Sequence, residues 1–560
     1  MNLRGFERFF NLMVTTGGGT APAVATNVGL GINTLDAITT GANNVAVGYQ
    51  ALDADTVGDK NVAVGSGAMG VNTTGAENTA VGYQSLDACT IGINNVALGS
   101  GSLGALTTGN DNVAVGQQAA DALTTGIDNV AIGSNALGAC TIGTDNIAIG
   151  DDTLLVLTTG VNNVAIGGDA LTAATIATGC VAIGKGALDA NTTGVNCVGI
   201  GLDALGAAIS SISNVAIGKD AMLVATAGNG NVAIGTSAMD ASTTSTTNVA
   251  IGLDALGATT TGSANVAVGS SAMKATVSAT NCVAVGKDAL LVATAGDQNV
   301  AVGALAMDAA TTGANNTCVG YDTLGVLTTG AQNVAIGSTA ANALTIATAC
   351  VAVGFDALGA VTTGVDNTAV GWSAGNTITT GDGNTCIGNN AQTGSATAVD
   401  RIMLSAGSGI GTADAANTSV NIGNDARAIR CDYGADQTWD APSDLRMKDV
   451  LAKSGLGLNF IMRLTPIEYR LRAPSQWPKE WEISPDAIVN TTQITLGLGA
   501  QEVKAALDAT GSCAFQGWSR SPNGKQFLGE SAFVYPLINA VKELIKRVEE
   551  REQRKLAACK

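Results

Sequence analysis

Residues 112–128 read NVAVGQQAADALTTGID, and this 17-residue stretch decides the fold. Its opening residues alternate, so Val113 and Val115 share one face of a short strand while Ala114 lies on the other. Gly116 then allows a tight corner at which a Cβ atom would clash. A second apolar segment, Ala-Ala-Asp-Ala-Leu, follows, and Thr-Thr-Gly turns the chain back. The stretch therefore predicts one coil of a β-solenoid.

The same unit recurs without interruption over about two thirds of the chain. Its corner glycine appears once in every such unit, from Gly31 through Gly48 and Gly65 to Gly388, which makes 22 copies. One such unit cannot bury a core alone, but stacked copies can, with each strand pairing to the equivalent strand one coil later. We therefore expect a mainly β fold, in which residues 27–400 form a parallel β-roll or β-solenoid shaft about 100 Å long, at about 4.8 Å per coil.

The residue that opens the unit predicts a ladder along this shaft. It is Asn in 18 of the 22 copies, and identical amides one coil apart can form hydrogen bonds up the stack. We interpret the cysteines of the shaft as small buried groups in Asn or Ala positions, because zinc-type spacing is absent. The 11 scattered cysteines of the chain are unlike a disulfide framework and favour synthesis in a reducing environment. The four copies without Asn carry Cys180, Cys197, Cys282 and Cys350.

Charge and composition divide the chain and exclude several functions. Residues 1–442 hold 10 Lys and Arg against 32 Asp and Glu, whereas residues 443–560 hold 17 against 13, which predicts a boundary near residue 443. The acidic shaft lacks the basic footprint of a nucleic-acid-binding protein. The chain has no His, which excludes Ser-His-Asp triads and His-based metal sites, and we expect no metal or cofactor. The sequence contains no uninterrupted apolar run long enough for a transmembrane helix, so we expect no membrane insertion.

The interior of the shaft is expected to be narrow and to contain only Ala and Val. Aromatic residues make up 3% of the chain, so few large side chains can fill a core. Packing one apolar face of each of three chains around a common axis would widen the buried core. This reasoning favours a homotrimer.

The repeat resembles the head repeats of trimeric autotransporter adhesins, which form a trimeric left-handed β-roll. The period of the repeat in this chain is longer than the usual unit of that family. Bacterial members also carry a signal peptide and a membrane-anchor barrel, whereas the apolar run after Arg8 is too short and mixed for a signal peptide. The resemblance therefore favours the phage fibres and tailspikes that use the same repeat.

After the repeats, residues 401–442 are expected to form a neck, and residues 443–560 to form a small α+β domain. The C-terminal helix is expected at 536–556, with apolar residues at coiled-coil spacing. The other expected elements are a helix at 455–464, a strand at 465–472 and a helix at 500–507; the coiled-coil positions are Leu537, Val541, Leu544 and Val548.

Three ordered stretches of this domain resemble the intramolecular chaperone domain of endosialidases and many phage tail fibres. They are SDLRMK at 443–448, LTPIEYR at 464–470 with GAQEV at 499–503, and the helix that begins at Tyr535. The resemblance implies a domain that drives trimerisation and folding of the fibre and then releases itself by cleavage at Ser443. Residues 496–499, LGLG, depart from the bulkier apolar residue that the family carries there.

The resemblance assigns catalysis of this cleavage to Ser443 and Lys448. Asp444 and Arg446 are expected to orient the loop. A serine needs a base, and in a chain without His a buried, neutral Lys can serve. Desolvation of Lys448 on assembly would then tie cleavage to folding. From the residues alone, Ser443 as a helix cap and Lys448 as a solvated charge remains the alternative, and which bond at Ser443 is cut stays open.

These features predict a structural homotrimeric phage tail fibre or virion surface protein that takes part in host attachment. Residues 1–26 would bind a virion tail or baseplate protein, with Arg4, Phe6, Phe9 and Phe10 as docking residues, and the shaft would meet a host surface receptor. Such a protein is made in the host cytoplasm and located in the virion. The alternative is a cell-surface trimeric adhesin or structural filament that uses the chaperone without cleavage.

Other solenoid functions fit the sequence less well. No activity on an external substrate is expected, because the shaft has scattered Asp residues and few aromatics in place of an aromatic-lined pair of carboxylates. Calcium-binding nonapeptides are absent. The Thr pairs precede Gly at a turn, which argues against an ice-binding array.

Overall fold

The structure is a computed structural model, and the chain divides into two compact units, Met1–Pro442 and Ser443–Lys560. The residues that it describes are 26–405, 419–424, 427–432, 439–440, 455–473, 476, 478, 492–511, 515, 517–520 and 525–558.

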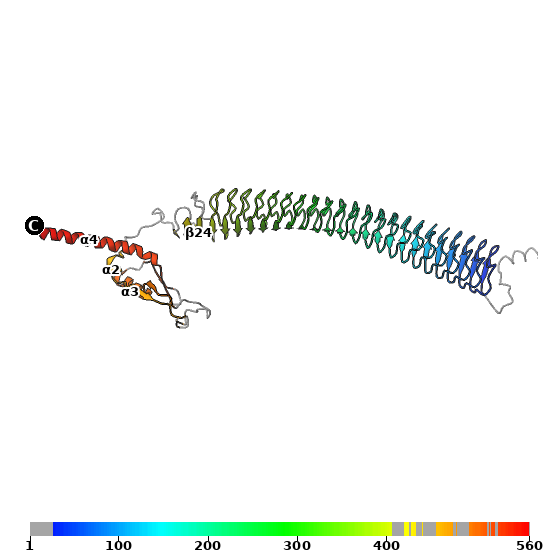
Figure 1. Ribbon diagram of the computed structural model, residues 1–560, viewed down its shortest axis with the longest axis horizontal. Helices are drawn as coiled ribbons and strands as arrows, with labels where there is room; N and C mark the ends of the chain where they lie inside the picture. The colour runs from blue at the N-terminus through cyan, green and yellow to red at the C-terminus, as the bar shows by residue number, and fades with distance from the viewer. Residues whose placement is uncertain are drawn as a thin grey trace, which may run out of the picture. The chain divides into compact units, whose positions relative to one another are not determined.

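The first unit is a parallel β-solenoid in which each coil contributes one three-residue strand to a single long sheet (Figure 1). Each strand pairs in register with the equivalent strand of the next coil, as Val113 does with Val130. The mainly β solenoid predicted from the repeat is confirmed. The strands are β1 (Val28–Leu30), β2 (Val45–Val47), β3 (Val62–Val64), β4 (Thr79–Val81), β5 (Val96–Leu98), β6 (Val113–Val115), β7 (Val130–Ile132), β8 (Ile147–Ile149), β9 (Val164–Ile166), β10 (Val181–Ile183), β11 (Val198–Ile200), β12 (Val215–Ile217), β13 (Val232–Ile234), β14 (Val249–Ile251), β15 (Val266–Val268), β16 (Val283–Val285), β17 (Val300–Val302), β18 (Thr317–Val319), β19 (Val334–Ile336), β20 (Val351–Val353), β21 (Thr368–Val370) and β22 (Thr385–Ile387).

The sheet continues into the segment 401–442, which is predicted from the sequence to be a neck. Strand β23 (Ile402–Leu404) pairs in parallel with β22, and β24 (Ser419–Asn424) pairs in parallel with β23. Two further strands, β25 (Arg427–Asp432) and β26 (Trp439–Asp440), then pair antiparallel. The change of direction ends the coil-by-coil repetition of the shaft.

The interior of the shaft differs from the expected filling of Ala and Val. Ala114 at the centre of β6 is fully buried, whereas Val113 and Val115 face outward and are only half-buried. In most coils the space inside is filled by a Leu or Met four residues after the corner glycine, such as Leu137 and Met239, both fully buried; where this residue is Ala120, the buried Leu123 follows it. The expectation was wrong because a three-residue strand that is apolar on both faces does not reveal which face lies inside.

The corner after each strand requires glycine. Gly116 has a φ of +141°, and a Cβ on it would lie 2.6 Å from the carbonyl carbon of Gly133 in the next coil. The turn that follows contains two further left-handed residues, Gln118 and Ala120. Close stacking of corners thus fixes both the glycine register and the tight turn.

Two ladders of side-chain hydrogen bonds hold neighbouring coils together. In the predicted Asn ladder, which is confirmed, Asn112 Nδ2 donates to Asn95 Oδ1 (3.1 Å) and to the Gly126 carbonyl (3.0 Å). A second ladder uses the first Thr of the Thr pair: Thr124 Oγ1 donates to the Thr141 carbonyl one coil later (2.8 Å). This Thr has a structural role in addition to the turn that the sequence predicted.

The second unit packs helices and two small antiparallel sheets around Phe460, with Leu456, Val503 and Leu507 also buried. Helix α4 (Val534–Ala558) is two residues longer at each end than the predicted helix 536–556. The expected strand 465–472 appears as β27 (Ile467–Tyr469), and the expected helix 500–507 appears as α3 (Ala500–Thr510). The expected helix 455–464 is the shorter α2 (Leu458–Ile461). The elements are α2 (Leu458–Ile461), β27 (Ile467–Tyr469), β28 (Thr495–Gly497), α3 (Ala500–Thr510), β29 (Trp518–Arg520), β30 (Gln526–Leu528), the 3₁₀ helix η4 (Glu530–Phe533) and α4 (Val534–Ala558).

Candidate functional site

The predicted cleavage site lies outside the described residues. This applies to Ser443 and Lys448 and to their supporting residues Asp444 and Arg446. The docking residues proposed near the N-terminus, Arg4, Phe6, Phe9 and Phe10, also lie outside them. Both assignments therefore stay predictions, and the candidate sites described next belong to the shaft and to α4.

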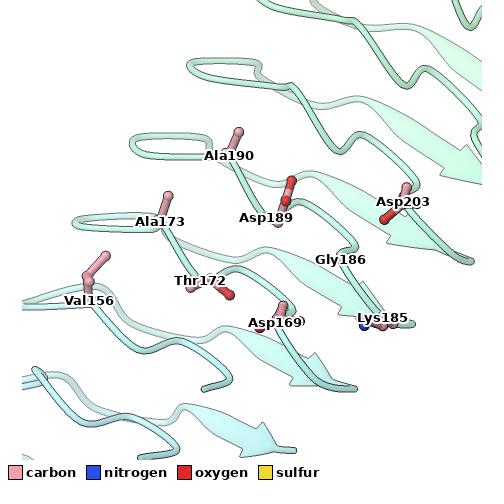
Figure 2. Close-up of a pocket in the computed structure, with 9 residues that line it drawn as sticks. All are labelled: Val156, Asp169, Thr172, Ala173, Lys185, Gly186, Asp189, Ala190 and Asp203. Carbon is pink, nitrogen blue, oxygen red and sulfur yellow. The ribbon is translucent and has the colours of Figure 1, made fainter. Parts of the chain in front are cut away.

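An open acidic groove of about 650 Å³ lies on the side of the shaft across four consecutive coils (Figure 2). Its charged side chains come from successive turns, one carboxylate from each of three coils and one ammonium group from the middle coil. The lining residues are Val156, Asp169, Thr172, Ala173, Lys185, Gly186, Asp189, Ala190 and Asp203.

The coil geometry explains how these carboxylates meet. Asp169 and Asp203 each stand two residues after a corner glycine, in the left-handed conformation, and Asp189 stands five residues after the glycine of the coil between them. Gly186 occupies the equivalent position of that middle coil, where a Cβ would lie against Asp203 Oδ1. The missing side chain at Gly186 leaves the groove open between the two outer aspartates.

Burial is the main cause that raises the pKa of Asp189, and the charges of Asp203 and Asp169 raise it further. The arrangement recurs along the shaft. The pKa of Asp240 is raised by burial and then by the charge of Asp254, and that of Asp308 by burial and then by the charge of Asp322. These aspartates look scattered along the sequence, but they are neighbours across successive coils. The sequence contains this spacing: Asp189 lies one coil plus three positions after Asp169, and one coil minus three positions before Asp203.

The main property of the groove is its negative charge. The hydroxyl of Thr172 donates to the Asp152 carbonyl (3.4 Å). In the part of the chain that the structure describes, no three acidic or thiol side chains are grouped so that they could hold a metal ion. Lysines beside the equivalent aspartates form exposed ion pairs, Lys219 with Asp220 and Lys287 with Asp288 (both 3.4 Å), which contribute little to stability.

The outward face of the long sheet forms a second candidate surface, which we call the aliphatic face. It consists of the first and third residues of strands β1–β22, almost all Val or Ile. Third residues such as Ile132 (37% exposed) and Ile336 (42% exposed) keep a large part of their surface in solvent. Contiguous apolar surface of this extent is typical of interaction sites.

Helix α4 carries a comparable apolar stripe. Its N-terminal part packs on α2, where Glu543 Oε2 accepts a hydrogen bond from the Leu458 backbone N–H (3.1 Å). Further along, Leu544 and Val548 are about half exposed, as are Leu537 and Val541. The positions predicted for a coiled coil are thus present on one helix and lie uncovered within this single chain.

The cysteines of the shaft behave as buried packing groups. All eight cysteines of residues 26–405 are buried and free, which confirms the prediction for the shaft. Cys180 replaces a ladder Asn, and its Sγ reaches the Gly194 carbonyl at 3.4 Å. Burial raises the pKa of the Cys89 thiol to about 11, so this thiol stays protonated and unreactive.

Comparison of the chain with protein-family models and with curated proteins finds no match. Among the described helices, none is long and apolar enough to cross a membrane. Function must therefore be argued from the surfaces themselves.

Proposed function

We propose that this chain is a structural subunit of a homotrimeric phage tail fibre or virion surface protein that takes part in host attachment. The aliphatic face is the observation that carries the proposal. A rigid sheet that presents two half-exposed aliphatic side chains per coil needs a partner surface, and a symmetric homo-oligomer supplies one from the same sequence.

The energetic case for assembly rests on repetition. Burial of apolar surface stabilises by about 25 cal/mol for each Å² removed from water. The apolar area of one coil is modest, so its burial stabilises assembly only a little, but the face repeats in register over 22 strands. Packing three such faces around a common axis therefore adds up to a large stabilisation, and it leaves the acidic groove residues on the outer surface of the fibre.

The C-terminal unit is proposed to be the chaperone that gathers the three chains. The apolar stripe of α4 supports this role, because a helix with uncovered coiled-coil positions gains stability by joining copies of itself. Identical repeats can align with one another at any multiple of one coil, so the repeat alone does not fix the register between chains. A separate trimerising element would fix that register.

Release of this unit is proposed to follow assembly. The chain divides into its two compact units at Ser443, the residue that the family resemblance assigns as nucleophile. In this mechanism a neutral Lys448 takes the Ser443 hydroxyl proton, and the oxygen attacks a peptide carbonyl at Ser443. The C–N bond of that peptide breaks, the Lys448 ammonium gives its proton to the leaving amine, and water then hydrolyses the ester. The fibre would then stay in the virion without its chaperone.

Three measurements test the proposal. Sedimentation equilibrium of the purified protein is expected to give the mass of three chains, and one or two chains would refute the trimer. Denaturing electrophoresis is expected to show two fragments for the wild type and for Ser454→Ala, a control in the same segment. Ser443→Ala and Lys448→Ala are expected to remain full length; an uncut wild type would refute self-cleavage. Immunogold labelling of virions checks the location.

A further inference from the structure

All five aromatic residues of the shaft occupy one register. Each directly follows the corner glycine of its coil, although the shaft repeats this position in every coil. None is buried: their exposed fractions run from 50% to 58%. Lys185, which holds the same register in Figure 2, lies at the corner where its strand ends. The residues are Tyr49, Tyr83, Tyr321, Phe355 and Trp372.

Three of these aromatics gather towards the C-terminal end of the shaft. Tyr321, Phe355 and Trp372 belong to coils two and one apart, and the rings of Phe355 and Trp372 lie parallel within 9°, with centroids 6.3 Å apart. The stacked rings of Phe355 and Trp372 and the exposed ring of Tyr321, one coil before Ser338, do not serve the core of the coil. They form a platform whose faces and edges are available to a ligand.

Fixed polar groups stand next to this platform. Asp356 Oδ2 accepts hydrogen bonds from Asn376 Nδ2 (3.1 Å) and from Ser373 Oγ (3.4 Å). Gln392 is buried and donates from Nε2 to Asn376 Oδ1 (2.6 Å) and to Asn390 Oδ1 (2.9 Å). The network holds amide and carboxylate groups in set orientations beside the rings, so a ligand does not have to order them.

The charge around the platform restricts the ligand. Residues 288–400 contain eight Asp and neither Lys nor Arg. Arg401, which directly follows this stretch, is buried and donates to the Thr393 carbonyl (2.6 Å), so a phosphate, sulfate or sialic acid would meet mainly like charge on the surface here. The same charge argues against a nucleic acid. The ligand must combine apolar C–H surface with hydroxyl groups and carry no negative charge.

We propose that Tyr321, Phe355 and Trp372, with the polar network around Asp356, form a binding site for a neutral saccharide. The C–H face of a pyranose stacks on the electron-rich face of an aromatic ring, while its hydroxyls bond to amide and carboxylate groups. This inference rests on the proposed role in host attachment and names its receptor class, a neutral glycan of the host surface.

Affinity electrophoresis of the full chain tests this site. Native gels would contain a neutral polysaccharide (dextran, mannan or galactomannan) or an anionic one (heparin or polygalacturonate). The wild type is expected to be retarded in at least one neutral gel and in neither anionic gel. Trp372→Ala is expected to raise the dissociation constant about tenfold or more. The double variant, which carries both Phe355→Ala and Trp372→Ala, is expected to show no retardation.

Matched variants separate stacking from general surface effects. Trp372→Phe keeps an aromatic ring and is expected to keep most of the retardation. Leu253→Ala removes a side chain of the same register that is 51% exposed, and it is expected to behave as the wild type. All variants are expected to sediment with the wild-type mass.

Three results would overturn the site: no retardation in any neutral gel, equal retardation of the wild type and the double variant, or retardation in the anionic gels alone. A changed mass for the double variant would assign the rings to self-assembly instead. A single-chain mass with intact retardation would refute the proposed trimer and leave the saccharide site standing.

Discussion

Asp55 and Asn72 lie at the same register of neighbouring coils, and each has a buried side-chain oxygen without a hydrogen-bond partner, Oδ2 and Oδ1 respectively. Asp55 Oδ1 accepts a bond from the Gly58 backbone N–H (2.8 Å), and Asn72 Nδ2 donates to the Gly75 carbonyl (3.1 Å). Both unsatisfied atoms are acceptors inside the shaft. A proton on Asp55 would supply a donor that this part of the interior lacks.

The first prediction follows from this proton. Burial raises the pKa of Asp55 from 3.8 to about 6, against the lowering effect of the bonds from Gly58, Asn61 and Asn72. The folded state therefore holds the proton more tightly than the unfolded chain. Stability of these coils is expected to fall as the pH rises from about 4 to about 6, by at most about 3 kcal/mol, and then to level off.

Hydrogen exchange of residues 45–75, corrected for the intrinsic pH dependence of exchange, measures this effect. Asp55→Asn is expected to make the local stability independent of pH over this range. Asp53→Asn, in the same coil, is expected to leave the dependence in place. Equal protection of the wild type at pH 4 and pH 7 would mean that Asp55 is not protonated in the fold.

The second prediction concerns the Asn ladder. Asn112→Ala removes the bond to the Gly126 carbonyl and the oxygen that accepts from the Asn129 backbone N–H (3.1 Å). Because these partners stay buried, we expect a loss of about 2–4 kcal/mol in chemical denaturation. Asn112→Cys is expected to cost less than Asn112→Ala, since a thiol can still reach the carbonyl as Cys180 does. Asn389→Ala, at an exposed position, serves as the control and is expected to change stability by less than about 0.5 kcal/mol.

The third prediction tests the aliphatic face. Replacing Ile132 and Ile149 by Lys would bring six ammonium groups together around the axis of the proposed trimer, without touching the coil interior. The sedimentation mass is expected to drop to one chain while the circular dichroism spectrum stays that of the wild type. Thr125→Lys, on the exposed turn, is the matched control. A double variant that stays trimeric would place the interface elsewhere.

The fourth prediction addresses α4 and the assembly of the fibre. Leu544→Asp with Val548→Asp puts charges on the apolar stripe, which opposes a coiled coil. We expect a strong fall in the yield of soluble trimer, measured by size-exclusion chromatography after refolding. Lys546→Ala, on the same helix, is expected to refold as the wild type does. Equal yields would show that the stripe is not needed for assembly.

The repeat made the shaft predictable because every coil repeats the same spacing of Gly, Asn and strand residues. The register of β6 on β7 and the Asn112 ladder both follow from that period. The inside of the coil was harder to predict, since Ala114 and its neighbouring valines are all apolar. Burial of Leu137 and its equivalents in the turn, which settles the question, depends on left-handed backbone angles that local sequence does not reveal.

The candidate surfaces were less predictable for a geometric reason. Asp169, Asp189 and Asp203 are neighbours only after the chain has wound into coils, so a reading along the chain separates them. The shared register of Phe355 and Trp372 is visible when the repeats are aligned, but the contact between their rings depends on how the coils stack. Ser443 and Lys448 were assigned by resemblance alone, and their geometry lies outside the described residues.

The direction of the strand pairing sets how the shaft responds to force. The hydrogen bonds between successive strands run along the stacking direction, so a pull along the shaft loads every rung in series, and the weakest rung limits the strength. Where Cys replaces the ladder Asn, the following coil loses the amide oxygen that would accept its backbone N–H. Under tension we therefore expect neighbouring coils to separate first at four places along the shaft. These are the junctions that follow Cys180, Cys197, Cys282 and Cys350.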